Sequence, residues 1–254
     1  MFPEAAQYDI TRIPGQVAGI DPAVTSRMKM LTGHQFYGLH EEYENCRGYI
    51  TLLRETVERV VSFYYYYVED LSCRFGRILN DNKISLEHFV SMEAKEIDRL
   101  DWQELHYSVE NGQTKLLAGE NVKAGEASNG LYEKALRNIE DKVLFLGLQE
   151  RYDESVVSIQ EILGWKKPLY YQKINVNDSR PKGEEIPDSI VKIIKERNRI
   201  DTKLHEKFTA DFDSRLPLPA NEIQKRVNKM RKLNTVYAGY ISVRKSVSRL
   251  VKGR

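Results

Sequence analysis

The feature that most constrains the fold is a run of apolar residues followed at once by a helical repeat, within Tyr49–Tyr67. Gly48–Leu53 (GYITLL) is rich in apolar and β-branched residues without polar alternation, which is typical of a strand buried on both faces. After Arg54, apolar residues recur at three- and four-residue spacing from Val57 to Val68, which indicates an amphipathic helix. A buried strand that leads directly into a helix predicts an α/β protein.

The same two patterns recur farther along the chain. A second buried strand is predicted at Lys142–Leu148 (KVLFLGL), and a shorter one at Met28–Leu31 is expected to carry His34 into a loop. Strands that alternate with helices favour a mainly parallel sheet with helices on its faces. Further helices are predicted at Lys83–Ile97, Asn129–Glu140, Tyr152–Leu163 and Pro187–Phe212, and over the basic segment that follows Pro219.

Length and charge distribution set the domain organisation. The chain has 254 residues, 41% of them hydrophobic, which is enough for one sizeable core. Lys and Arg together number 39 against 37 for Asp and Glu, but the charge is spread unevenly. The segment Asn221–Arg254 holds ten basic residues and one acid, Glu222. We therefore predict one domain over residues 1–216 and a basic helical tail over residues 217–254.

The composition also argues against several classes of protein. Cys46 and Cys73 are too few for a disulfide framework and lack the spacing of metal ligands, so no metal is expected. No apolar run approaches the roughly 20 residues that span a bilayer, so no transmembrane segment is expected in this chain. The first residues, MFPEAAQYDITR, lack the charged and then apolar layout of a signal peptide.

Two polar side chains give the element at Tyr49–Tyr67 a chemical role. In open α/β sheets, ligands collect at the carboxyl ends of the strands, and Arg54 stands at such an end. Ser62 falls about two turns into the predicted helix, so a guanidinium and a hydroxyl are expected to converge on one phosphate. The alternative is that Arg54 pairs with Glu55 or Glu58 and that Ser62 only packs the helix.

This element resembles the 3′-phosphate-binding element of sulfotransferases that use 3′-phosphoadenosine 5′-phosphosulfate (PAPS). The family pattern is an apolar strand, then Leu-Arg-Asp-Pro-x-x-Arg, then Ser and an aromatic run. Here the segment is LLRETVERVVSFYYYY, which places Arg54 and Ser62 on the phosphate-binding positions. Glu55 and Thr56 stand where the family has Asp-Pro, which raises the question of how the turn is built.

Other segments, in order, resemble the branch of carbohydrate sulfotransferases that contains uronyl and heparan sulfate 2-O-sulfotransferases and their bacterial relatives. The resemblance covers roughly residues 5–215 and implies a P-loop-like sulfotransferase fold, with a mainly parallel central sheet flanked by helices. It also implies PAPS as co-substrate and a carbohydrate hydroxyl as acceptor. The segments are GHQFYGLH (Gly33–His40), NGQTKLLAG (Asn111–Gly119), LGLQERYDESV with LGW (Leu146–Trp165), NVNDSRP (Asn175–Pro181) and Asn198 with Asp201.

The resemblance assigns roles to individual residues. His34 takes the position of the branch's proposed catalytic base, and a neutral imidazole can accept a proton near neutral pH. The residues expected to bind the nucleotide are Arg54, Ser62, Arg180 and Lys182. The residues expected on the acceptor side are His40, Gln113 and Lys115. For each of these, ordinary loop or packing roles remain the alternative.

The family's other phosphate site is a Lys-x-Gly/Ala-Gly-Thr-Thr/Ser loop after an N-terminal strand, and this sequence holds no such segment. Such a loop binds an anion at a helix N-terminus. We expect that the first strand and this loop are missing because the chain is truncated. The alternative is a non-catalytic glycan- or partner-binding protein that keeps the fold.

The partners and the compartment are left partly open. A polyanion contact through the basic tail is one hypothesis, a solvated helix is its alternative, and no nucleic-acid partner is expected. The resemblance implies a cytoplasmic protein if the source is bacterial. It implies the Golgi lumen if a missing N-terminus carries a membrane anchor.

Overall fold

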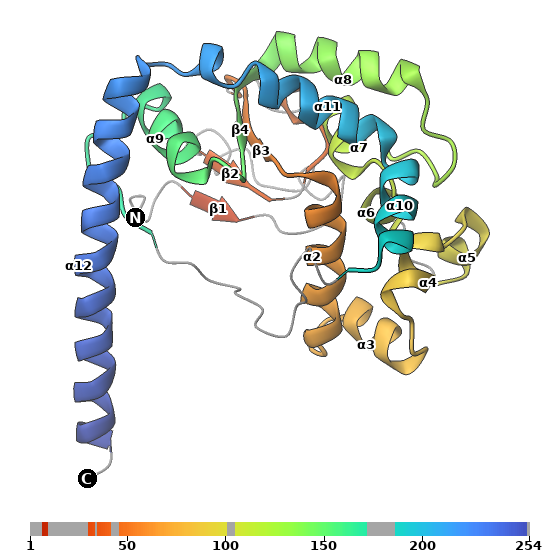
Figure 1. Ribbon diagram of the computed structural model, residues 1–254, viewed down its shortest axis with the longest axis horizontal. Helices are drawn as coiled ribbons and strands as arrows, with labels where there is room; N and C mark the ends of the chain where they lie inside the picture. Colours follow the sequence, from red (N-terminus) through yellow and green to blue (C-terminus); the bar gives the residue numbers. More distant parts are fainter. Residues whose placement is uncertain are drawn as a thin grey trace. The chain divides into compact units, whose positions relative to one another are not determined.

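The computed structural model describes residues 7–9, 30–33, 35–41, 46–100, 105–171 and 186–252 (Figure 1). Its internal contacts divide the chain into two compact units. Unit 1 comprises Met1–Tyr49, Glu55–Leu144 and Pro181–Glu206. Unit 2 comprises Ile50–Arg54, Phe145–Arg180 and Lys207–Arg254. The domain boundary at residue 216 stays a prediction.

The described strands form two small sheets. Strand β1 (Gln7–Asp9) pairs in parallel with β2 (Met30–Thr32), with Tyr8 opposite Leu31. Strand β3 (Tyr49–Leu53) is hydrogen-bonded to β4 (Val143–Leu148). The three later strands therefore lie where the apolar runs predict them. The predicted single, mainly parallel sheet is found only in part, because the described chain is mostly helical and its strands pair two by two.

Most of the described helices belong to unit 1. They are α2 (Thr56–Glu69), α3 (Arg74–Asp81), α4 (Leu86–Ser91), α5 (Ala94–Arg99), α6 (Leu105–Val109), α7 (Gly112–Ala118), α8 (Asn129–Lys142) and α10 (Asp188–Arg197). Helix α11 (Arg199–Ala210) begins in unit 1. Figure 1 shows α2 in orange beside α10 in cyan, and the two helices are in contact.

Two predicted helices are interrupted in the structure. The helix predicted at Lys83–Ile97 is two short helices, because Met92 takes an extended conformation (φ −55°, ψ 131°) that buries its side chain completely. The helix predicted at Pro187–Phe212 is divided into α10 and α11 at Asn198 (φ −109°, ψ 31°). The amide of Asn198 is committed to hydrogen bonds with other elements, which favours a break at this residue.

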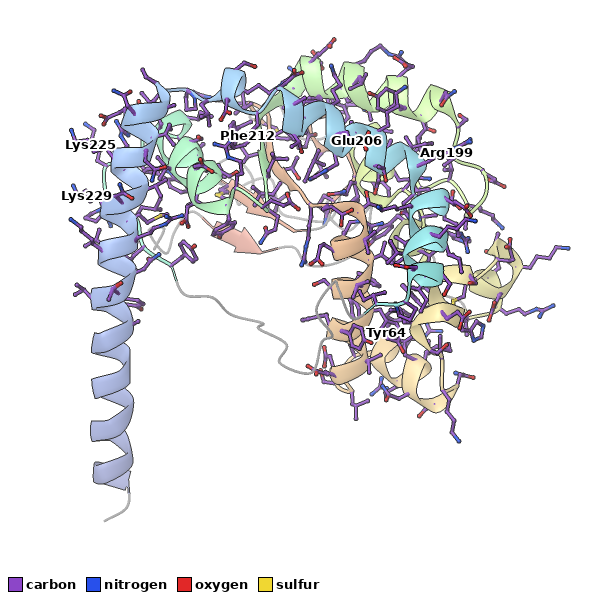
Figure 2. All side chains as sticks on the ribbon, in the orientation of Figure 1. Tyr64, Arg199, Glu206, Phe212, Lys225 and Lys229 are labelled. Atoms are coloured by element: carbon purple, nitrogen blue, oxygen red, sulfur yellow. The ribbon has the colours of Figure 1, made fainter. Side chains whose placement is uncertain are left out.

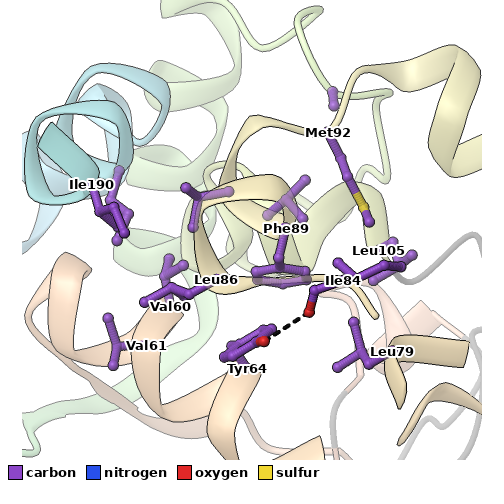
Figure 3. Packing of buried hydrophobic residues seen from close by; sticks show 14 of the residues in the cluster. Val60, Val61, Tyr64, Leu79, Ile84, Leu86, Phe89, Met92, Leu105 and Ile190 are labelled. Carbon is purple, nitrogen blue, oxygen red and sulfur yellow. Dashed lines mark hydrogen bonds between the residues drawn. The ribbon is translucent and has the colours of Figure 1, made fainter. Parts of the chain in front are cut away.

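The core of unit 1 forms where α2 meets α4 and α10. Val60 and Val61 of α2 are fully buried, and Phe89 of α4 stacks on Phe63 with ring centroids 6.0 Å apart. Figure 3 shows the hydroxyl of Tyr64 donating to the carbonyl of Ile84, at 2.7 Å. This bond satisfies the hydroxyl that Tyr64 carries into the apolar core between α2 and α4.

Unit 2 is built on β4, α9 (Tyr152–Ile162) and α12 (Ala220–Lys252). The predicted long helix of the basic tail is confirmed. Its buried residues Val227 and Met230 pack with Val157 of α9, and Figure 1 shows the two helices side by side. No helix in the described part of the chain is both long and apolar enough to cross a membrane.

Replacing Phe89 with alanine tests this core. We expect Phe89→Ala to lower the free energy of unfolding by roughly 3–5 kcal/mol, because a fully buried ring is replaced by a cavity. Urea unfolding followed by circular dichroism measures the change. The control is Leu71→Ala, whose side chain is 57% exposed and which should change stability by about 0.5 kcal/mol or less. Equal losses in both variants would contradict this description of the core.

Candidate cofactor and acceptor site

The strand–loop–helix element around Arg54 has the form that the sequence predicts. Strand β3 ends at Leu53, and α2 begins at Thr56. The carboxylate of Glu55 accepts the backbone N–H of Glu58 at 2.8 Å, so Glu55 is the N-cap of α2. Glu55 and Thr56 therefore start the helix where the family pattern has Asp-Pro, because a capping carboxylate stabilises a helix start without proline.

In the chain, one phosphate-binding candidate precedes this helix start and the other follows it. Arg54 is half-buried and ends the segment that belongs to unit 2. Ser62 is half-buried on α2, in unit 1. Thr56, the first residue of α2, is fully buried, and its hydroxyl accepts a hydrogen bond from that of Thr202 at 3.2 Å. The convergence of Arg54 and Ser62 on one phosphate stays a prediction.

A buried carboxylate on α11 connects this helix with α7 and α2. Asp201, at the start of α11, is fully buried. Its oxygens accept the backbone N–H groups of Gln113 (3.1 Å) and Thr114 (2.8 Å) and the Thr114 hydroxyl (2.7 Å). The carboxylate therefore caps the N-terminus of α7, where the helix dipole favours a negative charge.

Asn111 makes the reciprocal cap. Its backbone takes the left-handed conformation (φ 48°), and its side-chain oxygen accepts the N–H groups of Ile200 and Asp201 at 3.1 Å. Its amide nitrogen donates to the carbonyl of Arg197, at the end of α10. Helices α7 and α11 thus cap each other through one side chain apiece. We name Arg59, Asn111, Thr114, Asn198 and Asp201 the Asp201 network.

Arg59 joins α2 to this network. Its guanidinium donates to the carbonyl of Ser108 (3.2 Å) and to the side-chain oxygen of Asn198 (3.0 Å), and its Nε lies 3.6 Å from the Asp201 carboxylate. Arg59 is not among the site residues predicted from the sequence. The signal was present in the second arginine of the Leu-Arg-x-x-x-x-Arg pattern, but the structure gives this arginine a positioning role inside unit 1.

The two acceptor candidates on α7 face the interior. Gln113 is 9% exposed and Lys115 is fully buried. The ammonium of Lys115 donates to the carbonyl of His106 at 2.8 Å. Burial lowers the pKa of Lys115 to about 8, against the raising effect of Glu110 and Asp201. The ammonium of Lys115 thus has a structural contact, and acceptor binding by Gln113 and Lys115 stays a prediction.

The segment that contains His40 contacts the C-terminal end of α7. The backbone N–H of Tyr37 donates to the carbonyl of Leu116 at 2.8 Å. Gly119 ends α7 in a left-handed conformation (φ 73°), and a Cβ there would lie 2.5 Å from the carbonyl oxygen of Tyr37. Two segments of the family pattern, residues 33–40 and 111–119, are therefore in contact through Tyr37, and His40 of the first segment is half-buried.

A third segment of the pattern has a structural explanation in unit 2. The hydroxyl of Ser155 bonds both backbone groups of Leu148, accepting its N–H (3.0 Å) and donating to its carbonyl (3.1 Å). A Cβ at Gly147 would lie 2.8 Å from the Cβ of Ser155, so only glycine allows this approach. Arg151 pairs with Glu154 and Asp213 and fixes the turn before α9.

The basic tail uses part of its charge within unit 2. Arg226 pairs with Glu161 at 2.7 Å, and Arg231 pairs with Asp153 at 2.6 Å. Figure 2 shows Lys225 and Lys229 projecting from α12, and the Lys225 side chain is 81% exposed. Contact between this helix and a polyanion stays a prediction.

The remaining candidates are not described. His34, Arg180 and Lys182 lie outside the described residues, so their predicted roles as base and nucleotide contacts stay predictions. Within the described ranges, no group of three or more His, Cys, Asp or Glu side chains could hold a metal ion.

Comparison with known proteins identifies the family. A family model of galactose-3-O-sulfotransferase matches residues 24–239, which is most of the chain. The chain belongs to the galactose-3-O-sulfotransferase family. The matched range includes every candidate site residue named above.

Individual members of the galactose-3-O-sulfotransferase family also align with the chain. The chain is 25% identical over 165 residues to galactose-3-O-sulfotransferase 3 from Mus musculus and from Homo sapiens, and 24% identical to that from Bos taurus. The alignments cover 65% of this chain but 37% of each relative, so the chain spans little more than a third of their length. No solved structure matches the chain.

Membership in the galactose-3-O-sulfotransferase family confirms the predicted carbohydrate sulfotransferase class. The branch differs from the 2-O-sulfotransferases that the motifs resemble. The branch within this class was harder to predict, because the motifs at Asn111 and Ser155 have structural roles. Their side chains position helices and turns and do not indicate which sugar hydroxyl accepts the sulfuryl group.

Asp201→Asn tests the Asp201 network. We expect a loss of roughly 3–5 kcal/mol in the free energy of unfolding, because the Arg59 charge loses its buried partner and an amide N–H₂ meets backbone donors. Chemical unfolding measures it. The matched control is Glu196→Gln, whose ion pair with Lys192 is exposed and should matter by about 0.5 kcal/mol or less. A change below about 1 kcal/mol for Asp201→Asn would argue against a central role for this carboxylate.

Lys115 predicts a pH dependence of stability. Its folded pKa of about 8 lies below the ordinary 10.5, so between these values the unfolded chain binds more protons and stability rises with pH. Relative to Lys115→Met, the native protein should gain on the order of 3 kcal/mol from pH 8 to 10.5. Urea unfolding of both proteins across this range measures the difference. A difference that does not change with pH would show that the folded pKa is ordinary.

Proposed function

We propose that this protein transfers a sulfuryl group from PAPS to the 3-hydroxyl of a galactose residue in a carbohydrate acceptor. The observation that carries the proposal is the galactose-3-O-sulfotransferase match over residues 24–239. The alignments cover 37% of the galactose-3-O-sulfotransferase relatives. The substrates of this chain are therefore proposed from its family membership.

In the proposed reaction, the acceptor oxygen forms a bond to sulfur while the bond between sulfur and the 5′-phosphate oxygen breaks. The products are the sulfate ester and 3′-phosphoadenosine 5′-phosphate (PAP). The proton of the acceptor hydroxyl must go to a base, and we assign this role to His34. An imidazole with an ordinary pKa near 6.5 is largely neutral at pH 7 and can accept it.

The nucleotide is proposed to bind at the start of α2. Arg54 would offer its planar fork to the 3′-phosphate, and Ser62 would add a neutral donor to the same group. The capped helix start at Glu55 supports this assignment, since it orders the backbone between the two residues. Arg180 and Lys182, which lie outside the described residues, are proposed to cover the nucleotide.

The acceptor is proposed to lie against the segment that carries His40. Half-burial leaves part of this side chain accessible, whereas Lys115 is fully buried. Aromatic rings at Tyr37 and Tyr49 flank His40, with centroids 5.0 Å and 5.7 Å from the imidazole. Apolar ring faces next to hydrogen-bond donors suit a sugar, which combines C–H and hydroxyl surfaces.

Removal of Arg54 tests the nucleotide site. We expect Arg54→Ala to weaken PAP binding by roughly 10- to 100-fold, because it removes charge-assisted hydrogen bonds to the 3′-phosphate. Ser62→Ala removes one neutral donor and should weaken binding by about 2- to 10-fold. Isothermal titration calorimetry with PAP measures both.

The controls are Arg77→Ala on α3 and Ser91→Ala on α4, which replace exposed residues of the same types. Both should leave PAP affinity unchanged. Unchanged affinity in Arg54→Ala would refute the assignment of this arginine. Transfer of radiolabelled sulfate from PAPS to a β-galactoside then tests the reaction itself. PAP or galactoside binding without any transfer would favour the non-catalytic alternative.

A further inference from the structure

The hydroxyl of Tyr49, the first residue of β3, lies among three groups of the loop that carries His40. The backbone N–H of Gly38 donates to the Tyr49 oxygen at 3.3 Å, and that of His40 donates to it at 2.9 Å. The Nδ1 atom of His40 lies 2.8 Å from the same oxygen. All of these residues belong to unit 1.

The direction of the bond between Tyr49 and Nδ1 of His40 follows from the protons available. A phenol oxygen carries one proton and two lone pairs, and an amide N–H can only donate. The two backbone N–H groups occupy the lone pairs of the Tyr49 oxygen, so its own proton must go to Nδ1 of His40. Nδ1 is then an acceptor, and in a neutral imidazole the ring proton is on Nε2.

A protonated His40 would not fit this arrangement. An imidazolium carries a proton on Nδ1 as well, and this proton would face a Tyr49 oxygen that already accepts two N–H groups. Deprotonation of Tyr49 would relieve the conflict, but burial raises the pKa of this phenol against the lowering effect of the two backbone N–H groups. Of the neighbouring groups, Cys46 and Glu41 raise that pKa further.

Packing fixes the plane of the imidazole. The ring of Tyr37 lies 5.0 Å from both His40 and Tyr49, edge-on to His40 at 65° and tilted to Tyr49 by 34°. The hydroxyl of Tyr37 donates to Asp141 at 3.0 Å and therefore does not compete for Nδ1. Nε2 has no hydrogen-bond partner among the residues that the structure describes, so it is the nitrogen available to a ligand.

We propose that Tyr49 is a positioning residue that holds His40 as the neutral Nε2–H tautomer, so that Nε2 donates a hydrogen bond to an oxygen of the acceptor sugar. The tautomer follows from unit 1 alone. The identity of the ligand rests on the proposed function. In this arrangement His40 is a donor and not the base of the reaction, because its only basic nitrogen is occupied by Tyr49.

Nitrogen NMR of the histidine side chains tests the tautomer directly. With ¹⁵N-labelled protein at neutral pH, the His40 signals, assigned by comparison with His40→Gln, should show a protonated Nε2 and an unprotonated Nδ1. Tyr49→Phe keeps the ring and removes the hydroxyl, so the preference should fall to the mixture seen in exposed histidines. Tyr37→Phe removes a hydroxyl that bonds Asp141 instead and should leave the His40 tautomer unchanged.

Two outcomes of this experiment would overturn the proposal. One is an Nδ1–H or doubly protonated His40 in the native protein. The other is an unchanged tautomer in a folded Tyr49→Phe variant, with folding checked by circular dichroism. If Tyr49→Phe does not fold, the native tautomer and the histidine variants below still decide the question.

Substitution of His40 tests which nitrogen contacts the acceptor. Glutamine can place an amide N–H₂ near the position of Nε2, whereas asparagine reaches only as far as Nδ1. We expect KM for a β-galactoside to be about 2- to 10-fold lower in His40→Gln than in His40→Asn, the effect of one hydrogen bond, with similar kcat. Equal or reversed KM values would exclude a donor at Nε2.

A binding experiment separates this inference from the proposed function. Titration of the labelled native protein with methyl β-D-galactoside should shift the Nε2–H signal of His40, whether or not the protein transfers sulfate. A shift without transfer would refute the enzyme and keep the donor role of His40. Transfer without a shift would keep the enzyme and refute the donor role.

Discussion

The buried carboxylate of Asp201 is the constraint on which the rest of unit 1 depends. A fully buried charge is tolerated only when hydrogen bonds and a partner charge surround it, and Asp201 has both. Its ligands come from α7 and, through Arg59, from α2, while Asn111 returns the cap to α11. Asp201 and Asn111 therefore fix the starts of two helices, and Arg59 joins them to α2.

This arrangement connects the two predicted halves of the site. Ser62 lies on α2, which Arg59 joins to the Asp201 network. The loop that carries His40 is held to α7 by the hydrogen bond from the Tyr37 N–H to the carbonyl of Leu116. The residues of unit 1 that are proposed for the nucleotide and for the acceptor are thus held by helices that share one set of buried hydrogen bonds. The proposed sulfuryl transfer would require such fixed placement, because the reacting oxygen, sulfur and leaving oxygen must be in line.

The sequence predicted the local structure where periodicity or capping decides it, as in β3, α2, α8 and the tail helix. It missed the break at Asn198, because apolar spacing runs through that residue. The interruption is explained by long-range hydrogen bonds of its side chain with Arg59, Asn111 and Val109. The resemblance placed Lys115 on the acceptor side, and no pattern along the chain showed that this residue is buried, because burial is decided by tertiary packing. Tyr49 was passed over as a strand residue, and no pattern along the chain reveals where a hydroxyl will meet a loop.

The two histidines of the segment at residues 33–40 need not share a role. A base must present a nitrogen with a free lone pair, and the arrangement at Tyr49 leaves His40 none, because Nδ1 accepts the phenol proton and Nε2 carries a proton. If the reaction proceeds with a histidine base from this segment, the base is His34. His40 is then a neutral hydrogen-bond donor that orients the acceptor and does not accept its proton. The difference between the two histidines follows from one tyrosine hydroxyl and two backbone N–H groups.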